Sequence, residues 1–141
     1  NRDAARALRA GVVHACTDVT GFGLLGHAYE MAHGSAVRLV LEAERLPLLP
    51  GALALAGAGH LTGGCRRIRE WLAGRVRVDA RVPAELVEVA FDPQTSGGLL
   101  VAVPAAEAAG TLERLHAAGV AVAVQVGHVE PPAGGEPIEL R

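Results

Sequence analysis

The chain contains 141 residues, of which 50% are hydrophobic and only 3% aromatic, and 13 arginines against 15 acidic residues give a net charge of −2. This length suits one domain with a core of Leu, Val and Ala. The slightly negative charge argues against a protein that binds nucleic acid or a membrane surface. Because lysine is absent from the sequence, these residues contain no P-loop lysine, lysine base or Schiff-base lysine.

The two cysteines, Cys16 and Cys65, form neither a disulfide framework nor a Cys-x-x-Cys pair. We therefore expect two unbridged thiols in a reducing, cytoplasmic setting. No stretch of these residues has the pattern of a signal peptide or the length of an apolar membrane span. The sequence opens at Asn1 inside a helical pattern, which leads us to expect a trimmed fragment of a longer protein.

Helices and strands are predicted to alternate along the first half of the chain. In order, we expect a helix at 2–10, a strand at 12–15, a helix from Leu24 to near Gly34, a strand at 37–41, a turn framed by Pro47 and Pro50, and a short helix at 51–58. The helix that follows Gly23 is predicted to bury one face, formed by Phe22, Leu25, Ala28, Tyr29 and Ala32.

The second half continues the alternation, which by itself indicates layered α/β structure. We expect a glycine-rich segment at 60–65, a helix at 66–72 with Trp71 facing inward, a half-exposed strand at 75–81, a helix at 84–90, a strand at 99–103, a helix at 105–118 and a last strand at 120–129. Residues 1–130 are expected to form the domain. Residues 131–141 are expected to form a loop or tail, with 138–140 as the candidate for an edge strand.

The stretch from Cys16 to His27 is where we look first for a function. A predicted strand leads to Asp18, a turn containing Thr20 and two glycines follows, and a helix then begins. The start of a helix favours anions, and glycines let a ligand approach the backbone. Asp18 would repel a bare phosphate but binds one through Mg²⁺. On this pattern alone, a purely structural Asp that caps the helix or forms the turn remains the alternative.

Two blocks of this sequence resemble the C-terminal signatures of the selenophosphate synthetase (selenide, water dikinase) family: residues 17–27 (TDVTGFGLLGH) and residues 92–100 (DPQTSGGLL). A third block, residues 63–67 (GGCRR), is similar more weakly and departs from the family pattern at Cys65 and at the following Ile68. The resemblance covers the chain to Glu130 and corresponds to the C-terminal half of the enzyme. It implies an α+β fold, layered α/β, in which a mixed sheet packs with helices as in the aminoimidazole ribonucleotide synthetase superfamily.

The resemblance also implies an activity: the family makes selenophosphate from ATP, selenide and water, releases AMP and phosphate, and requires Mg²⁺. Asp18 is the implied metal ligand. The implied residues for binding ATP are Thr17, Thr20, Gly21, Gly23, Thr95, Ser96 and Gly97. We expect no catalytic residue here, because the family's reactive Cys or selenocysteine and its Lys belong to an N-terminal half.

The expected partners are that N-terminal half, a second copy in a homodimer, and the small molecules selenide and ATP; nucleic acid and membranes are not expected. The segment alone is expected to be inactive. Two alternatives remain open: another ATP-dependent member of the same superfamily, or a stand-alone binding or dimerisation module without catalysis.

Several other residues have weaker functional readings. The histidines lack metal-ligand spacing, so His14 and His27 are expected to be packing or surface groups. We expect Cys16 to be a small buried hydrophobe and Asp92 to close an Asx turn at Pro93. For Arg66 and Arg67, phosphate contact and a solvated helix start are both open. For Thr95 to Gly98, phosphate binding and an ordinary loop are equally open.

Overall fold

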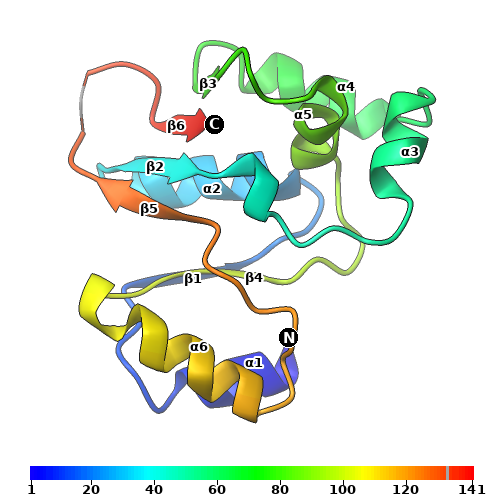
Figure 1. Ribbon diagram of the computed structural model, residues 1–141. Coiled ribbons are helices and arrows are strands. Elements are labelled where there is room, and N and C mark those ends of the chain that lie inside the picture. Colours follow the sequence, from blue (N-terminus) through cyan, green and yellow to red (C-terminus); the bar gives the residue numbers. More distant parts are fainter. Residues whose placement is uncertain (133) are drawn as a thin grey trace.

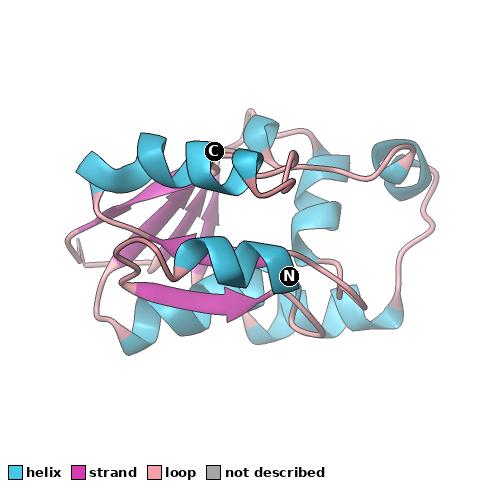
Figure 2. Cartoon of the chain, turned by 90° about the horizontal axis from the view of Figure 1, so that it is seen from below, coloured by secondary structure: helices cyan, strands magenta, loops and turns pink. Residues whose placement is uncertain are grey.

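The computed structural model describes residues 1–132 and 134–141, and it has the predicted α+β class (Figure 1). A two-stranded ribbon and a four-stranded mixed sheet lie among helices, as the view from below also shows (Figure 2). Within these ranges no helix is long and apolar enough to cross a membrane. The α-helices are α1 (Arg2–Leu8), α2 (Gly23–Gly34), α3 (Ala52–Gly57), α4 (Gly63–Trp71), α5 (Ala84–Phe91) and α6 (Ala108–Ala117). The strands are β1 (Ala15–Asp18), β2 (Arg38–Leu41), β3 (Val76–Val78), β4 (Leu99–Ala102), β5 (Gly127–Glu130) and β6 (Ile138–Leu140).

The four-stranded sheet has the order β3-β6-β2-β5. Strand β6 pairs in parallel with both neighbours, so that Ile138 lies opposite Val76 on one side and Leu39 on the other, while β5 pairs antiparallel with β2. Residues 138–140 therefore form an interior strand, and the prediction of an edge strand was wrong. Ala133, within the loop predicted at 131–137, lies outside the described residues.

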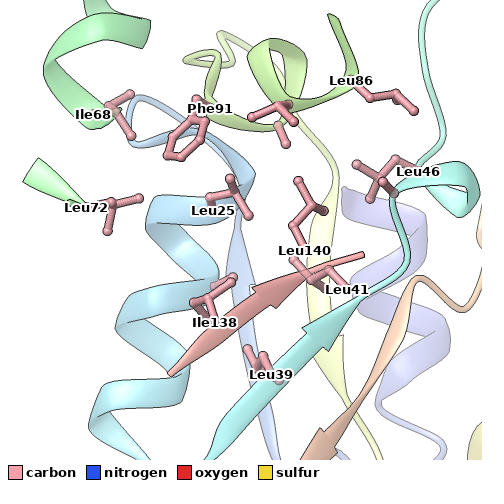
Figure 3. Close-up of a cluster of buried hydrophobic side chains, with 14 of the residues drawn as sticks. Leu25, Leu39, Leu41, Leu46, Ile68, Leu72, Leu86, Phe91, Ile138 and Leu140 are labelled. Atoms are coloured by element: carbon pink, nitrogen blue, oxygen red, sulfur yellow. The ribbon is translucent and has the colours of Figure 1, made fainter. Parts of the chain in front are cut away.

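The main core lies between this sheet and helices α2, α4 and α5 (Figure 3). Strands β2 and β6 contribute leucines and an isoleucine from one sheet face, because alternate residues of a strand point to the same side. Leu25 of α2, Ile138 and Leu140 are completely buried, and Phe91 of α5 closes the cluster. Burying a side chain of this kind stabilises the fold by about 1.5–3 kcal/mol, so the strand nearest the C-terminus is a main contributor to the core.

Two predicted strands are displaced. The first forms at Ala15–Asp18 instead of 12–15, because pairing with β4 begins where the amide of His14 donates to the carbonyl of Ala102 and continues to Asp18. The last forms only at Gly127–Glu130, and residues 120–126 are turn and irregular chain. A Cβ on Gly127 would lie 1.9 Å from the carbonyl oxygen of Val40, so the close approach of β5 to β2 begins at a glycine.

The prediction that Trp71 faces inward was wrong, because this residue is 38% exposed. Helix α4 begins at Gly63, three residues earlier than expected, after the N-cap residue Thr62. Cys65, Ile68 and Leu72 form its buried stripe, at the spacing of one helix face. Trp71 lies at the border of that stripe.

Candidate functional site

The two blocks that resemble family signatures lie side by side. Strands β1 and β4 pair antiparallel, with Asp18 opposite Leu99, so the loop that follows β1 and the loop that precedes β4 leave the ribbon at the same end. Asp18 stands exposed at this end, and Thr95 and Ser96 are exposed on the neighbouring loop. The fold thus gathers residues about 80 positions apart around one carboxylate.

Backbone hydrogen bonds fasten these two loops together. The amide of Val19 donates to the carbonyl of Gly98 at 2.9 Å, and the amide of Gln94 donates to the carbonyl of Thr20 at 2.9 Å. A Cβ on Gly97 would lie 2.2 Å from the carbonyl oxygen of Val19. Such a contact is impossible without moving the backbone, so Gly97 permits the close approach of the loops.

The glycines between Asp18 and α2 differ in what the fold requires of them. Gly23 has φ of +64°, and a Cβ there would lie 2.8 Å and 2.9 Å from the carbonyl oxygens of Phe91 and Asp92. Its conformation and its packing against the end of α5 both require glycine. Gly21 is exposed, its φ lies outside the positive range, and a Cβ there would meet no atom within 4 Å. The described structure therefore places no demand for glycine at position 21.

Asp18 is the acidic side chain at the end of β1. Among the residues that the structure describes, no group of three His, Cys, Asp or Glu side chains could hold a metal ion. The Thr17 hydroxyl donates to the carbonyl of Asp18 at 3.3 Å and lies on the opposite face of the ribbon. A Mg²⁺ ion accepts one or two carboxylates and completes its shell with phosphate oxygens and water. The exposed Asp18 carboxylate fits this chemistry as one ligand of a shared site.

Thr20 has a partner that the sequence did not reveal. Its hydroxyl lies 3.1 Å from Nε2 of His27, which is buried on the second turn of α2, and Nδ1 of His27 lies 3.8 Å from a carboxylate oxygen of Glu30. His27 was expected to be a packing or surface group. It is buried, and it also fixes the side chain of Thr20, seven residues earlier, through a polar contact.

The third block completes the site from the side of α4. Thr62 caps this helix by accepting a hydrogen bond from the amide of Cys65, and it donates to Oδ1 of Asp92. A Cβ on Gly64 would lie 2.5 Å from Cγ of Pro93. The carboxylate of Asp92 meets the side-chain amide of Gln94 at 3.3 Å, whereas the backbone amide of Gln94 is bonded to Thr20. The predicted Asx turn at Pro93 is therefore wrong.

The two thiols are free and differ in environment. Cys16 is exposed on β1, so the prediction that it is buried was wrong; desolvation, and then the nearby Asp18 carboxylate, raise its pKa above the ordinary value. Cys65 is buried, and burial together with a hydrogen bond to Glu88 raises its pKa to about 11. Both thiols are therefore neutral at physiological pH, which disfavours a nucleophilic role because the thiolate is the reactive form.

Comparison with known proteins agrees with this architecture. The family model for the C-terminal domain of AIR synthase related proteins matches residues 1–138, and the chain belongs to this family. Curated proteins named "Selenide, water dikinase" are similar: the protein of Caldanaerobacter subterraneus is 44% identical over 116 residues, which is 82% of this chain and 33% of that protein. The protein of Pelobacter propionicus is 43% identical over 129 residues, 92% of this chain and 37% of that protein. The resemblance drawn from the two motifs is thus confirmed, and the chain spans about a third of the length of the relatives it matches.

Proposed function

We propose that this chain is the C-terminal domain of a selenide, water dikinase, which converts ATP, selenide and water into selenophosphate, AMP and phosphate. The similarity to proteins of that name supports the reaction. The main support for a role of this domain in the reaction is the exposed Asp18 carboxylate, which lies where two loops are joined by backbone hydrogen bonds. Asp18 is the residue to which we assign a Mg²⁺ contact.

The metal, when bound, would neutralise charge on the phosphate oxygens of ATP. Phosphoryl transfer depends mainly on positioning and on such neutralisation. The chain's own part is to hold Asp18 at a fixed place, since its strand is paired with β4 and the next residue, Val19, is buried and bonded to Gly98. A carboxylate held in this way needs little reorganisation when the nucleotide arrives.

The proposed contacts to ATP are the seven residues named from the motifs, Thr17, Thr20, Gly21, Gly23, Thr95, Ser96 and Gly97. Gly21, Thr95 and Ser96 are exposed, which suits direct contact. Gly23 and Gly97 already serve the packing of the loops, which suits an indirect role in shaping them.

One carboxylate rarely holds Mg²⁺ alone. We therefore propose that the remaining acids, the reactive Cys or selenocysteine and the Lys come from a further part of the same enzyme, and that the enzyme works as a homodimer in the cytoplasm. The two free thiols support a reducing compartment.

The test is Asp18→Asn in the whole enzyme, with turnover measured against Mg²⁺ concentration. Asn keeps the shape of the residue and a neutral oxygen but removes the negative charge. Such a charge typically stabilises the transition state by several kcal/mol. At ~1.4 kcal/mol per factor of ten, we expect turnover to fall on the order of a hundredfold. Excess Mg²⁺ should restore part of it by mass action. Asp3→Asn, at an exposed acid of α1, is the matched control. Normal turnover with unchanged Mg²⁺ dependence in Asp18→Asn would show that Asp18 is structural.

A further inference from the structure

A buried histidine of α2 contacts the loop that follows Asp18. His27 is 8% exposed, and its Nε2 lies 3.1 Å from the hydroxyl of Thr20. Its Nδ1 lies 3.8 Å from a carboxylate oxygen of Glu30, which is exposed about one turn further along the helix. A hydroxyl, an imidazole and a carboxylate therefore follow one another from the loop to the exposed side of α2.

The fold does not need this contact to hold the backbone of the loop. The carbonyl of Thr20 accepts hydrogen bonds from the amides of Gly23 at 3.0 Å and of Gln94 at 2.9 Å. These bonds already fix the main chain at Thr20, so the contact with His27 orients the side chain. The imidazole is itself held in place, because the ring of Phe22 packs against it with centroids 5.4 Å apart.

The carboxylate of Glu30 determines which hydrogen bond the Thr20 hydroxyl makes. A neutral imidazole carries one hydrogen, and a carboxylate beside Nδ1 favours the tautomer with the hydrogen on that nitrogen. Nε2 of His27 is then an acceptor, so Thr20 donates its hydroxyl hydrogen to it. The Thr20 oxygen keeps its lone pairs, and it therefore accepts hydrogen bonds from other groups but donates none to them.

Such a hydroxyl is unsuited to phosphate and suited to water. Phosphate oxygens are strong hydrogen-bond acceptors and need donors, which the exposed hydroxyls of Thr95 and Ser96 on the neighbouring loop offer. A water molecule has two hydrogens to donate, so it matches an oxygen that only accepts. Thr20 is thus a partner for water at the end of β1.

We propose that His27 is a positioning residue, which through Thr20 orients the water molecule that the reaction consumes. This inference rests on the proposed function, and it gives Thr20 a contact with the reacting phosphate through water instead of a direct one. Thr20 is two residues after Asp18, a span of at most about 7 Å. Water bound to Thr20 therefore lies beside the phosphates that Asp18 would reach through Mg²⁺.

The step that this water takes part in is hydrolysis at phosphorus. The water oxygen forms a bond to phosphorus, the bond between phosphorus and the oxygen of the AMP leaving group breaks, and the proton that the water loses ends on the products or in the solvent. A reactant held in the direction of attack lowers the barrier of such a step. The contribution of Thr20 is this direction, given by one hydrogen bond.

The first test measures AMP release by the whole enzyme with ATP and selenide. Thr20→Val keeps the shape of the side chain but removes the hydroxyl, and His27→Leu removes the acceptor for that hydroxyl. We expect each variant to lower kcat about tenfold, the scale of one lost hydrogen bond, with KM for ATP unchanged. The double variant should lose no more than Thr20→Val alone, because His27 acts through Thr20.

Conservative variants separate positioning from folding. His27→Gln offers an amide oxygen to the Thr20 hydroxyl, and Thr20→Ser keeps the hydroxyl, so both should retain more turnover than His27→Leu and Thr20→Val. His33→Leu is the matched control and should keep a normal kcat, since His33 is an exposed histidine of the same helix that stacks on Tyr29. Should His27→Leu fail to fold in thermal melts, the two Thr20 variants and His27→Gln carry the test.

A second test does not depend on activity. Nitrogen-15 NMR of the histidine rings in the whole enzyme at about pH 8, where neutral imidazole is the usual form, reports which ring nitrogen carries the hydrogen. The His27→Gln spectrum identifies the signal of His27. We expect its hydrogen on Nδ1.

The outcomes separate this inference from the function beneath it. A hydrogen on Nε2, additive losses in the double variant, or a raised KM for ATP with unchanged kcat in Thr20→Val would overturn the role of His27 and leave the Mg²⁺ contact of Asp18 standing. Equal turnover in His27→Gln and His27→Leu would do the same. A whole enzyme that releases no AMP in the presence of selenide would overturn the proposed function, and with it this inference.

Discussion

The hydroxyl of Thr62 donates a hydrogen bond to Oδ1 of Asp92 at 3.2 Å, joining two residues that lie 30 positions apart. The same hydroxyl accepts from the amide of Cys65 at 3.2 Å. One side chain thus caps the start of α4 and holds it against the residue that follows α5. Thr62, directly before the third motif block, thereby connects that block to Asp92 of the second.

Thr62→Ala should therefore cost more than an ordinary surface substitution. Loss of an N-cap costs about 1 kcal/mol, and loss of the bond to Asp92 adds a contribution of about the same size. Thr62→Ser keeps the hydroxyl and should recover most of the free energy of unfolding, as measured by urea denaturation. Equal stability of the Ala and Ser variants would contradict the double role of this hydroxyl.

Gly97→Ala should disrupt the contact between the two loops. The added Cβ would lie 2.2 Å from the carbonyl oxygen of Val19, so the backbone must move, at a cost of typically 1–3 kcal/mol or more. The neighbouring Gly98 has open space around it, and Gly98→Ala is the matched control for stability. Thermal melts of both variants test this, and a melting temperature in Gly97→Ala as high as in the control would count against the tight approach.

The buried thiol of Cys65 should make the fold sensitive to alkaline pH. Its pKa is raised from 9.0 to about 11, so the folded state favours the neutral thiol. The neutral thiol's contribution to the free energy of unfolding is fully present below pH 9. It is lost as the pH rises from about 9 to 11, by an amount on the order of 2 kcal/mol. The free energy of unfolding between pH 8 and 11 should fall less steeply in Cys65→Ala. Both proteins should carry Cys16→Ala, which leaves Cys65 as the only thiol compared; identical slopes would refute the prediction.

Leu140→Ala should be among the most damaging substitutions in the chain. Leu140 is completely buried in β6, and removing a buried leucine side chain costs about 2–5 kcal/mol. Val129→Ala, at an exposed position of β5, is the control and should cost under about 1 kcal/mol. Chemical denaturation measures both. Similar losses at the two positions would mean that β6 is not the interior strand.

The 141-residue chain alone should release no AMP from ATP above a buffer blank. Its described residues contain no cluster of acids to hold the metal, and the sequence has no lysine. Steady AMP release that Asp18→Asn abolishes would show instead that these residues form a complete active site.

The regular helices and the grouping of the two main motifs could be predicted from the sequence, because their signals are local. Gly34 and Gly119 mark helix ends, and the motif blocks carry their own resemblance. The strand errors have a tertiary cause. Val12 and Val13 are apolar but exposed, since the register with β4 places Ala15 to Asp18 in the ribbon. Nothing near residues 138–140 reveals that two distant strands will flank them.

In the candidate site too, residues with a local sequence signal could be predicted, and contacts set by the tertiary structure could not. Asp18, Thr95 and Ser96 follow from the motifs, whereas the contact between Thr20 and His27 depends on how the loop meets the second turn of α2. The inward prediction for Trp71 failed because Cys65, Ile68 and Leu72 form the buried stripe of α4 and leave Trp71 at its border.

The interior position of β6 determines when the sheet can fold during synthesis of the chain. Residues 138–140 are the last of the sheet to leave the ribosome, and until they do β3 and β2 each lack the neighbour that separates them. Unpaired strand edges invite wrong pairing with other chains, and contacts between distant segments form slowly. The four-stranded sheet and its core therefore form only after β6, a strand of three residues, has been synthesised and has paired between β3 and β2.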